Sequence, residues 1–150
     1  MKIARIGSLC LLLATTACLY TEPNVYAMDS LDVVSRLARV KVEPSNNGPF
    51  GRLDFSARRQ GSRKVIWTAT GSHAHRRCEI EVTPVDPGSS RVDINCRGAS
   101  PSSGVVAGLE TSYTRKRAIE LIDATLRGRE YDPRLAQGST AWGWPDEQGG

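Results

Sequence analysis

Long hydrophobic runs, histidines and aromatic residues are all scarce in this chain of 150 residues. The longest apolar stretch, residues 6–17, is shorter than the ~20 residues that a membrane-spanning helix needs. Only two histidines are present, and neither a Gly-x-Ser-x-Gly elbow nor a Gly-rich phosphate-binding motif occurs. Nucleophilic and nucleotide chemistry therefore lack a recognisable motif. We predict no catalytic residue and no cofactor.

The N-terminus has the pattern of an export signal. Two basic residues precede the apolar stretch of residues 6–17, which has the length of a secretory h-region. Thr15-Thr16-Ala17-Cys18 resembles a bacterial lipobox, although Leu13 does not stand three residues before the cysteine, where that motif usually has leucine. Cleavage before Cys18 would make this cysteine the site of lipid attachment. Cleavage after Ala27 is the alternative, and it would leave no anchor.

We favour cleavage before Cys18, because the other site would discard a segment that can pair as an edge strand, Asn24-Val25-Tyr26. The prediction is a signal peptide over 1–17, with 27 as the other possible end, and a tether or first strand over 18–28. It implies an exported, periplasmic protein that is bound to the membrane through a lipid on Cys18.

Residues 29–131 are predicted to form a single α+β domain. Asp29 or Ser30 can cap a short helix that runs through Arg39. Two runs with apolar residues at period two then indicate strands, one over Leu53, Phe55 and Ala57 and the other over Val65, Trp67 and Ala69. Polar, Gly-rich composition predicts a flexible tail over 132–150, in which Trp142 and Trp144 are isolated.

The most specific pattern is a hairpin around the turn residues Asp86-Pro87-Gly88. Pairing residues 77–83 with 91–97 about Pro87 sets Cys78 opposite Cys96, Ile80 opposite Ile94 and Val82 opposite Val92. One register thus places six apolar or sulfur side chains on one face, and a slip of one residue would break every pair.

The same register brings two of the four cysteines, Cys78 and Cys96, opposite each other. Directly opposed antiparallel residues have Cα atoms about 4.5 to 5.5 Å apart, within disulfide range, and exported proteins meet oxidising conditions. We predict a disulfide between Cys78 and Cys96. A metal site made of His73, His75 and these cysteines is not predicted, because strand alternation places the histidines on the opposite face from Cys78.

A second, long helix is predicted to begin between Ser102 and Val105 and to end at Arg127, before Gly128. The predicted fold class is therefore α+β: a four- to five-stranded antiparallel meander with a short N-terminal helix and a long C-terminal helix packed on one face. Arginines cluster at predicted turns, but acids are interleaved almost everywhere and stacking aromatics do not alternate with them, so no nucleic-acid partner is predicted. A basic loop tip facing anionic lipid or polysaccharide fits an exported protein better.

The order of elements over residues 24–128 is similar to that of the SRPBCC (START-like) helix-grip superfamily. The likeness rests on Val25-Tyr26-Ala27, the early helix with Val33 and Leu37, the strands around Trp67, Ile80 and Ile94, and residues 118–126 as the closing helix. This chain is shorter, with fewer strands than the family usually has. Members grip an apolar ligand between sheet and long helix, and some act as cyclases or lipid carriers.

Two functions follow as expectations. The first is a non-enzymatic module of the bacterial envelope that binds a hydrophobic small molecule, a lipid or another envelope protein. The alternative is a small helix-grip-type enzyme, cyclase-like or hydrolase-like, that acts on an apolar substrate. The residues expected to line a ligand cavity are Phe55, Trp67, Ile80, Ile94, Tyr113 and Ile122.

Overall fold

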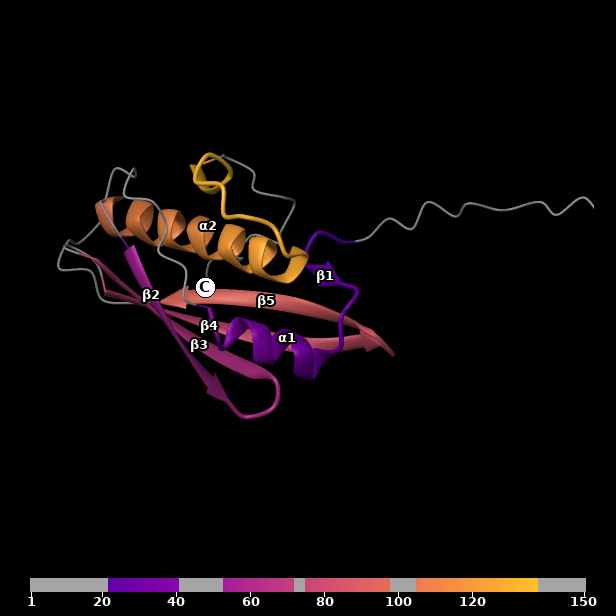
Figure 1. The fold of residues 1–150 in the computed structure, drawn as a ribbon. Helices are drawn as coiled ribbons and strands as arrows, with labels where there is room; N and C mark the ends of the chain where they lie inside the picture. Colours follow the sequence, from indigo (N-terminus) through magenta and orange to yellow (C-terminus); the bar gives the residue numbers. More distant parts are fainter. Residues whose placement is uncertain (1–21, 41–52, 72–74, 98–104, 138–150) are drawn as a thin grey trace, which may run out of the picture.

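An open five-stranded antiparallel sheet and two helices make up the described part of the chain (Figure 1). The computed structural model describes residues 22–40, 53–71, 75–97 and 105–137. The meander consists of β2 (Leu53–Gln60), β3 (Lys64–Gly71), β4 (His75–Asp86) and β5 (Ser89–Arg97). A short strand, β1 (Val25–Tyr26), lies beside β5, so the order across the sheet is β1-β5-β4-β3-β2. The predicted α+β fold class is confirmed.

β1 shows that Asn24-Val25-Tyr26 pairs at a sheet edge, as predicted. Val25 lies opposite Arg91 and Tyr26 opposite Ser90. Asn24 extends the pairing, because its carbonyl accepts the Val92 N–H at 2.9 Å and its side-chain amide donates to the Val92 carbonyl at 3.3 Å. This segment is therefore part of the folded domain.

The β4–β5 hairpin has the predicted register, in which Cys78 faces Cys96, Ile80 faces Ile94 and Val82 faces Val92. Both strands run further toward the turn than the apolar pattern indicated, with a register irregularity between Pro84 and Asp86. The turn itself is Pro87-Gly88, and Gly88 has φ +93°, a conformation that glycine adopts without steric cost. The turn is therefore shorter and the hairpin longer than the sequence indicated, while the apolar pairs are the predicted ones.

The two helices pack on the same face of the sheet and contact each other (Figure 1). α1 (Ser30–Leu37) buries Val33, Val34 and Leu37. It ends at Leu37 rather than at Arg39, and Asp29 occupies the N-cap position without a side-chain capping bond; only its carbonyl accepts the Val33 N–H. α2 (Val105–Arg127) ends as predicted, with Gly128 in the left-handed conformation at φ +66°.

The core lies between this sheet face and the helices, and alternation along the strands explains its content. In β4 and β5 the residues that face the helices are buried and their neighbours face solvent. The buried cluster includes Val65 and Trp67 from β3, and β1, β4, β5, α1 and α2 each contribute buried side chains to it. Phe55 and Ala57 of β2 are only partly buried at its margin, where β2 forms the edge of the sheet opposite β1.

Packed structure continues past residue 131, the domain end expected from composition. A short 3-10 helix, η1 (Leu135–Gln137), contacts α2, and Ala136 is buried. The Asp132 N–H also donates to the Glu120 carboxylate at 2.9 Å. The remainder of the expected tail, with Trp142 and Trp144, lies outside the described residues.

Candidate functional site

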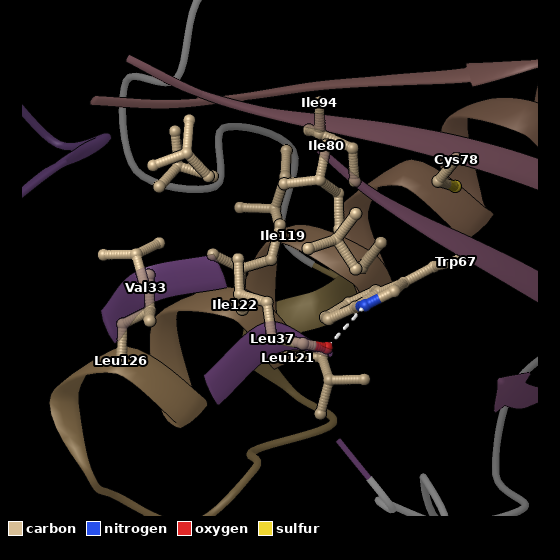
Figure 2. Close-up of a cluster of buried hydrophobic side chains, with 14 of the residues drawn as sticks. Val33, Leu37, Trp67, Cys78, Ile80, Ile94, Ile119, Leu121, Ile122 and Leu126 are labelled. Atoms are coloured by element: carbon tan, nitrogen blue, oxygen red, sulfur yellow. Dashed lines mark hydrogen bonds between the residues drawn. The ribbon is translucent and has the colours of Figure 1, made fainter. Parts of the chain in front are cut away.

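Four of the six side chains expected to line a cavity lie together in the core (Figure 2). Trp67, Ile80 and Ile122 have no exposed surface, and Ile94 is 5% exposed. They come from β3, β4, β5 and α2, so chain segments far apart in sequence converge there. These contacts are those of a hydrophobic core, and a role in ligand binding stays a prediction.

The other two expected cavity residues lie in different environments. The Phe55 ring is partly buried and meets the Trp67 ring edge-on, with 5.8 Å between centroids. Tyr113 does not belong to the core cluster; its ring lies 5.5 Å from the guanidinium carbon of Arg117, within cation–π range. Phe55 therefore lies at the margin of the hydrophobic cluster, whereas Tyr113 lies outside it, beside the charged side chain of Arg117.

Trp67 ties the sheet to α1 through the single polar atom of its side chain. Its indole N–H donates to the backbone carbonyl of Leu37 at 2.9 Å, in a buried setting (Figure 2). Leu37 is the last residue of α1, where helix carbonyls have no partner within the helix. The bond satisfies both groups, so this indole is committed to the fold and offers no hydrogen bond to a ligand.

The sulfur atoms of Cys78 and Cys96 lie 2.03 Å apart, at bonding distance, and both residues are buried. They face the core from adjacent strands, as the hairpin register requires. His75 is exposed where Cys78 is buried, which agrees with the predicted alternation, and His73 lies outside the described residues. Among the described residues no group of three or more His, Cys, Asp or Glu side chains is placed to hold a metal ion.

A second assembly, built around two buried acids, was not predicted: the charged cluster of Tyr26, Glu120, Asp123, Arg127 and Arg129. Glu120 has no exposed surface and Asp123 is 4% exposed, although both are acids on α2. Arg129 follows α2 and reaches back to both, binding the two Glu120 oxygens at 2.5 and 2.7 Å and Asp123 at 2.8 Å. This two-pronged contact matches the planar guanidinium to the carboxylate.

Asp123 connects this cluster to the edge strand. It accepts a hydrogen bond from the Tyr26 hydroxyl at 3.2 Å and one from Arg127 Nε at 2.6 Å. The Arg127 guanidinium also lies over the Tyr26 ring, 5.4 Å from its centroid. The cluster therefore joins β1, α2 and the segment after α2 at one place.

The electrostatics of the charged cluster favour fixed ion pairs. Burial, together with the Asp123 carboxylate, raises the pKa of Tyr26 well above its ordinary value, so its hydroxyl stays a donor. Hydrogen bonds to Glu120 and Asp123 raise the pKa of Arg129, which remains charged. Because the carboxylates are held by arginine and tyrosine donors, they are poorly suited to proton transfer with a substrate.

Two buried arginines extend the polar interior. Arg117 of α2 is 2% exposed. Burial raises the pKa of Tyr131, and the Arg117 charge opposes part of that rise. Arg76 of β4 is fully buried and points to the same side of the sheet as Cys78. Arg76 and Arg77 are adjacent in the sequence, and strand alternation divides them between the two faces, with Arg77 exposed.

A signal for the charged cluster is present in the sequence in hindsight. Glu120, Asp123 and Arg127 are spaced three and four residues apart, which places them on one helix face. The apolar residues of α2 alone do not mark this face, because the acids Glu120 and Asp123 are buried on it. Arg129 lies beyond the end of α2, so no helical spacing in the sequence connects it to Glu120.

Comparison with known proteins does not assign this chain to a family. No protein-family model matches this chain, and neither the curated proteins nor the solved structures contain a significant match. No helix within the described ranges has the length and apolar character to cross a bilayer. Cys18, the predicted lipid attachment site, lies outside the described residues.

Proposed function

We propose that this chain is an exported bacterial envelope protein, anchored through a lipid on Cys18, that works as a binding module for another envelope component. The observation that carries the proposal is the buried cysteine pair at bonding distance. Disulfides persist in the periplasm and outside the cell, and are rare where glutathione and thioredoxin keep thiols reduced. The cysteine pair thus supports the export to an oxidising compartment that the N-terminal sequence predicts.

Binding at the surface is favoured over binding in the interior. Four of the six side chains expected to enclose an apolar ligand are packed together in the core, and the Trp67 indole is bonded to the Leu37 carbonyl. A ligand between sheet and α2 would have to separate these contacts, each buried apolar side chain contributing roughly 1.5–3 kcal/mol. The helix-grip enzyme gains no support either, because the buried carboxylates Glu120 and Asp123 are held by Arg129.

Mass spectrometry of the chain purified from bacterial membranes tests the proposal. We expect an N-terminus at Cys18 carrying diacylglycerol, and no alkylation of Cys78 or Cys96 under denaturing, non-reducing conditions. An N-terminus at Met28 without lipid would disprove the anchor, and two alkylated thiols would remove the argument for an oxidising compartment.

The same preparation separates the two binding hypotheses. A Cys18→Ala variant lacks the acyl acceptor, so any lipid that remains bound in equimolar amount must be held by the protein fold. We expect none after detergent exchange. Equimolar lipid in this variant would instead favour an apolar ligand between the sheet and α2.

A further inference from the structure

The turn between β2 and β3 carries a dense group of basic side chains, named here the basic tip: Arg58, Arg59, Arg63 and Lys64. No acid occurs between residues 58 and 64. The three arginines are exposed, and Lys64 is half-buried. Gly61 forms the turn with φ +74°, so the chain reverses sharply and holds the four side chains within a short span.

The basic tip has positive charge that the fold does not neutralise. Arg59 Nε donates to the Gly61 carbonyl at 2.8 Å and supports the turn. Lys64 lies 3.7 Å from Glu79, which also pairs with Arg77 at 3.3 Å. The Arg58 and Arg63 side chains have no hydrogen bond or ion pair with any described residue. Two arginines are thus available to an external anion.

Strand register places the basic tip at the end of the sheet that carries β1, close to residue 22, where the described part of the chain begins. The Arg63 carbonyl accepts the Val82 N–H at 2.8 Å, and Val82 pairs with Val92, which in turn bonds to Asn24. The β4–β5 turn lies at this same end, since Asp86 pairs with Ser89. Figure 1 shows β1 and the β4–β5 turn at the right of the sheet and the β2–β3 turn at its lower edge.

Residues 22–26 are bonded to the rest of the domain at that end. Glu22 pairs with Arg91 at 2.5 Å, and Asn24 and Tyr26 bond to β5 and α2. If Cys18 carries the lipid, four peptide units separate it from Glu22, a reach of at most about 14 Å. This step rests on the proposed function, and it brings the basic-tip end of the sheet close to the bilayer.

Two exposed apolar side chains share this end of the molecule. Val85, 49% exposed, lies beside the β4–β5 turn, and Leu31, 56% exposed, lies in the first turn of α1. α1 is held near the turn because the Ser90 hydroxyl donates to the Met28 carbonyl at 2.9 Å. Exposed apolar groups beside arginines suit the boundary between headgroups and acyl chains.

We propose that the basic tip binds the anionic phospholipid headgroups of the membrane that anchors the chain, through Arg58 and Arg63. Arginine forms paired hydrogen bonds with phosphate oxygens and keeps its charge. Acids lie around the basic tip, among them Glu81 opposite Lys64 and Asp86 at the neighbouring turn. Their negative charge limits the surface that attracts anionic lipid to the tip itself. The domain would then stand on the membrane in one orientation, with the opposite end of the sheet directed away from it.

The test measures vesicle binding in the full chain with Cys18→Ala, so that no acyl group contributes. Sedimentation with phosphatidylcholine vesicles, with and without phosphatidylglycerol, isolates the part of the affinity that depends on lipid charge. Each arginine near an anionic surface contributes about fivefold to binding, so Arg58→Gln with Arg63→Gln should weaken binding to anionic vesicles about 25-fold. Raising salt from about 0.05 M to about 0.5 M should remove the same difference by screening.

The matched control is Arg77→Gln with Arg97→Gln. These two arginines are also exposed and lose the same charge, but they face each other at the opposite end of the sheet. Only a small change is expected in this control. Equal losses in both double variants would overturn the proposal by showing a response to net charge alone, and so would equal affinity of the parent for neutral and anionic vesicles. Failure here leaves the N-terminal mass result untouched, so this inference and the proposed anchor can fail separately.

Discussion

Replacing Glu120 by glutamine is the sharpest test of the charged cluster. Glu120 is fully buried, and its two oxygens accept three donors: Arg129 at 2.5 and 2.7 Å and the Asp132 N–H at 2.9 Å. Glutamine keeps the shape but turns one oxygen into an NH2 donor. Whichever way the amide is oriented, a donor then faces a donor, and at least one of the three bonds is lost.

The expected cost is set by two opposing effects. Removing one partner of a fully buried ion pair costs about 3–5 kcal/mol, because the remaining charge is left without compensation. Arg129 is not in that position, since its side chain is 30% exposed and keeps its contact with Asp123 at 2.8 Å. Water and Asp123 can therefore take up part of the lost interaction, and we expect Glu120→Gln to lower the free energy of unfolding by about 2–3 kcal/mol.

Urea unfolding followed by far-UV circular dichroism measures this loss, and the neighbouring Glu130→Gln is the matched control. Glu130 is exposed, so its substitution should change stability by less than about 0.5 kcal/mol. In a double-mutant cycle with Arg129→Gln, the coupling to Glu120 should be about 1–2 kcal/mol. A cost for Glu120→Gln no larger than that of Glu130→Gln would refute the reasoning, as would a coupling below about 0.5 kcal/mol.

Two further predictions concern the cysteine pair and Tyr26. Cys78 and Cys96 are separated by 18 positions, so cutting that link, by a reductant or by Cys78→Ala with Cys96→Ala, should cost about 3 kcal/mol and lower the urea midpoint; identical oxidised and reduced midpoints would show that no bond exists. The folded-state pKa of Tyr26 is raised above its usual value of 10.0, so the stability it contributes is complete below that pH and is lost as pH rises toward the folded pKa. Between pH 10 and 11 the parent should lose about 1 kcal/mol that Tyr26→Phe does not, and parallel pH profiles would contradict the assignment.

The hairpin register was predictable because three independent pairs had to agree. Cys78, Ile80 and Val82 find their partners in only one alignment, and a slip by one residue turns the whole apolar set to the solvent. The edge strand at Asn24-Val25-Tyr26 was a weaker signal, since two strand residues carry little pattern. It was nevertheless correct, because β1 only extends an edge that β5 already offers.

Other features depend on contacts that no local pattern encodes. α1 ends at Leu37 because tertiary bonding closes it there: its last carbonyl receives the Trp67 indole N–H, contributed from thirty positions further along the chain. Likewise, polar composition predicts a loose tail from residue 132 on, although the chain between residues 129 and 137 is packed. This segment packs on α2 because Arg129 and Asp132 find a buried acid there.

The buried acids of α2 could not be predicted from the apolar pattern of this helix. An apolar count assigns the sheet-facing side of this helix to Ile119 and Ile122 and leaves Glu120 and Asp123 to solvent, because isolated carboxylates are too costly to bury. The cost is removed only when Tyr26 and Arg129, from opposite ends of the domain sequence, meet at the same helix. The described fold thus uses its buried polar groups to hold β1 in place. A firmly held β1 is what a short lipid tether requires if it is to orient the basic tip toward the membrane.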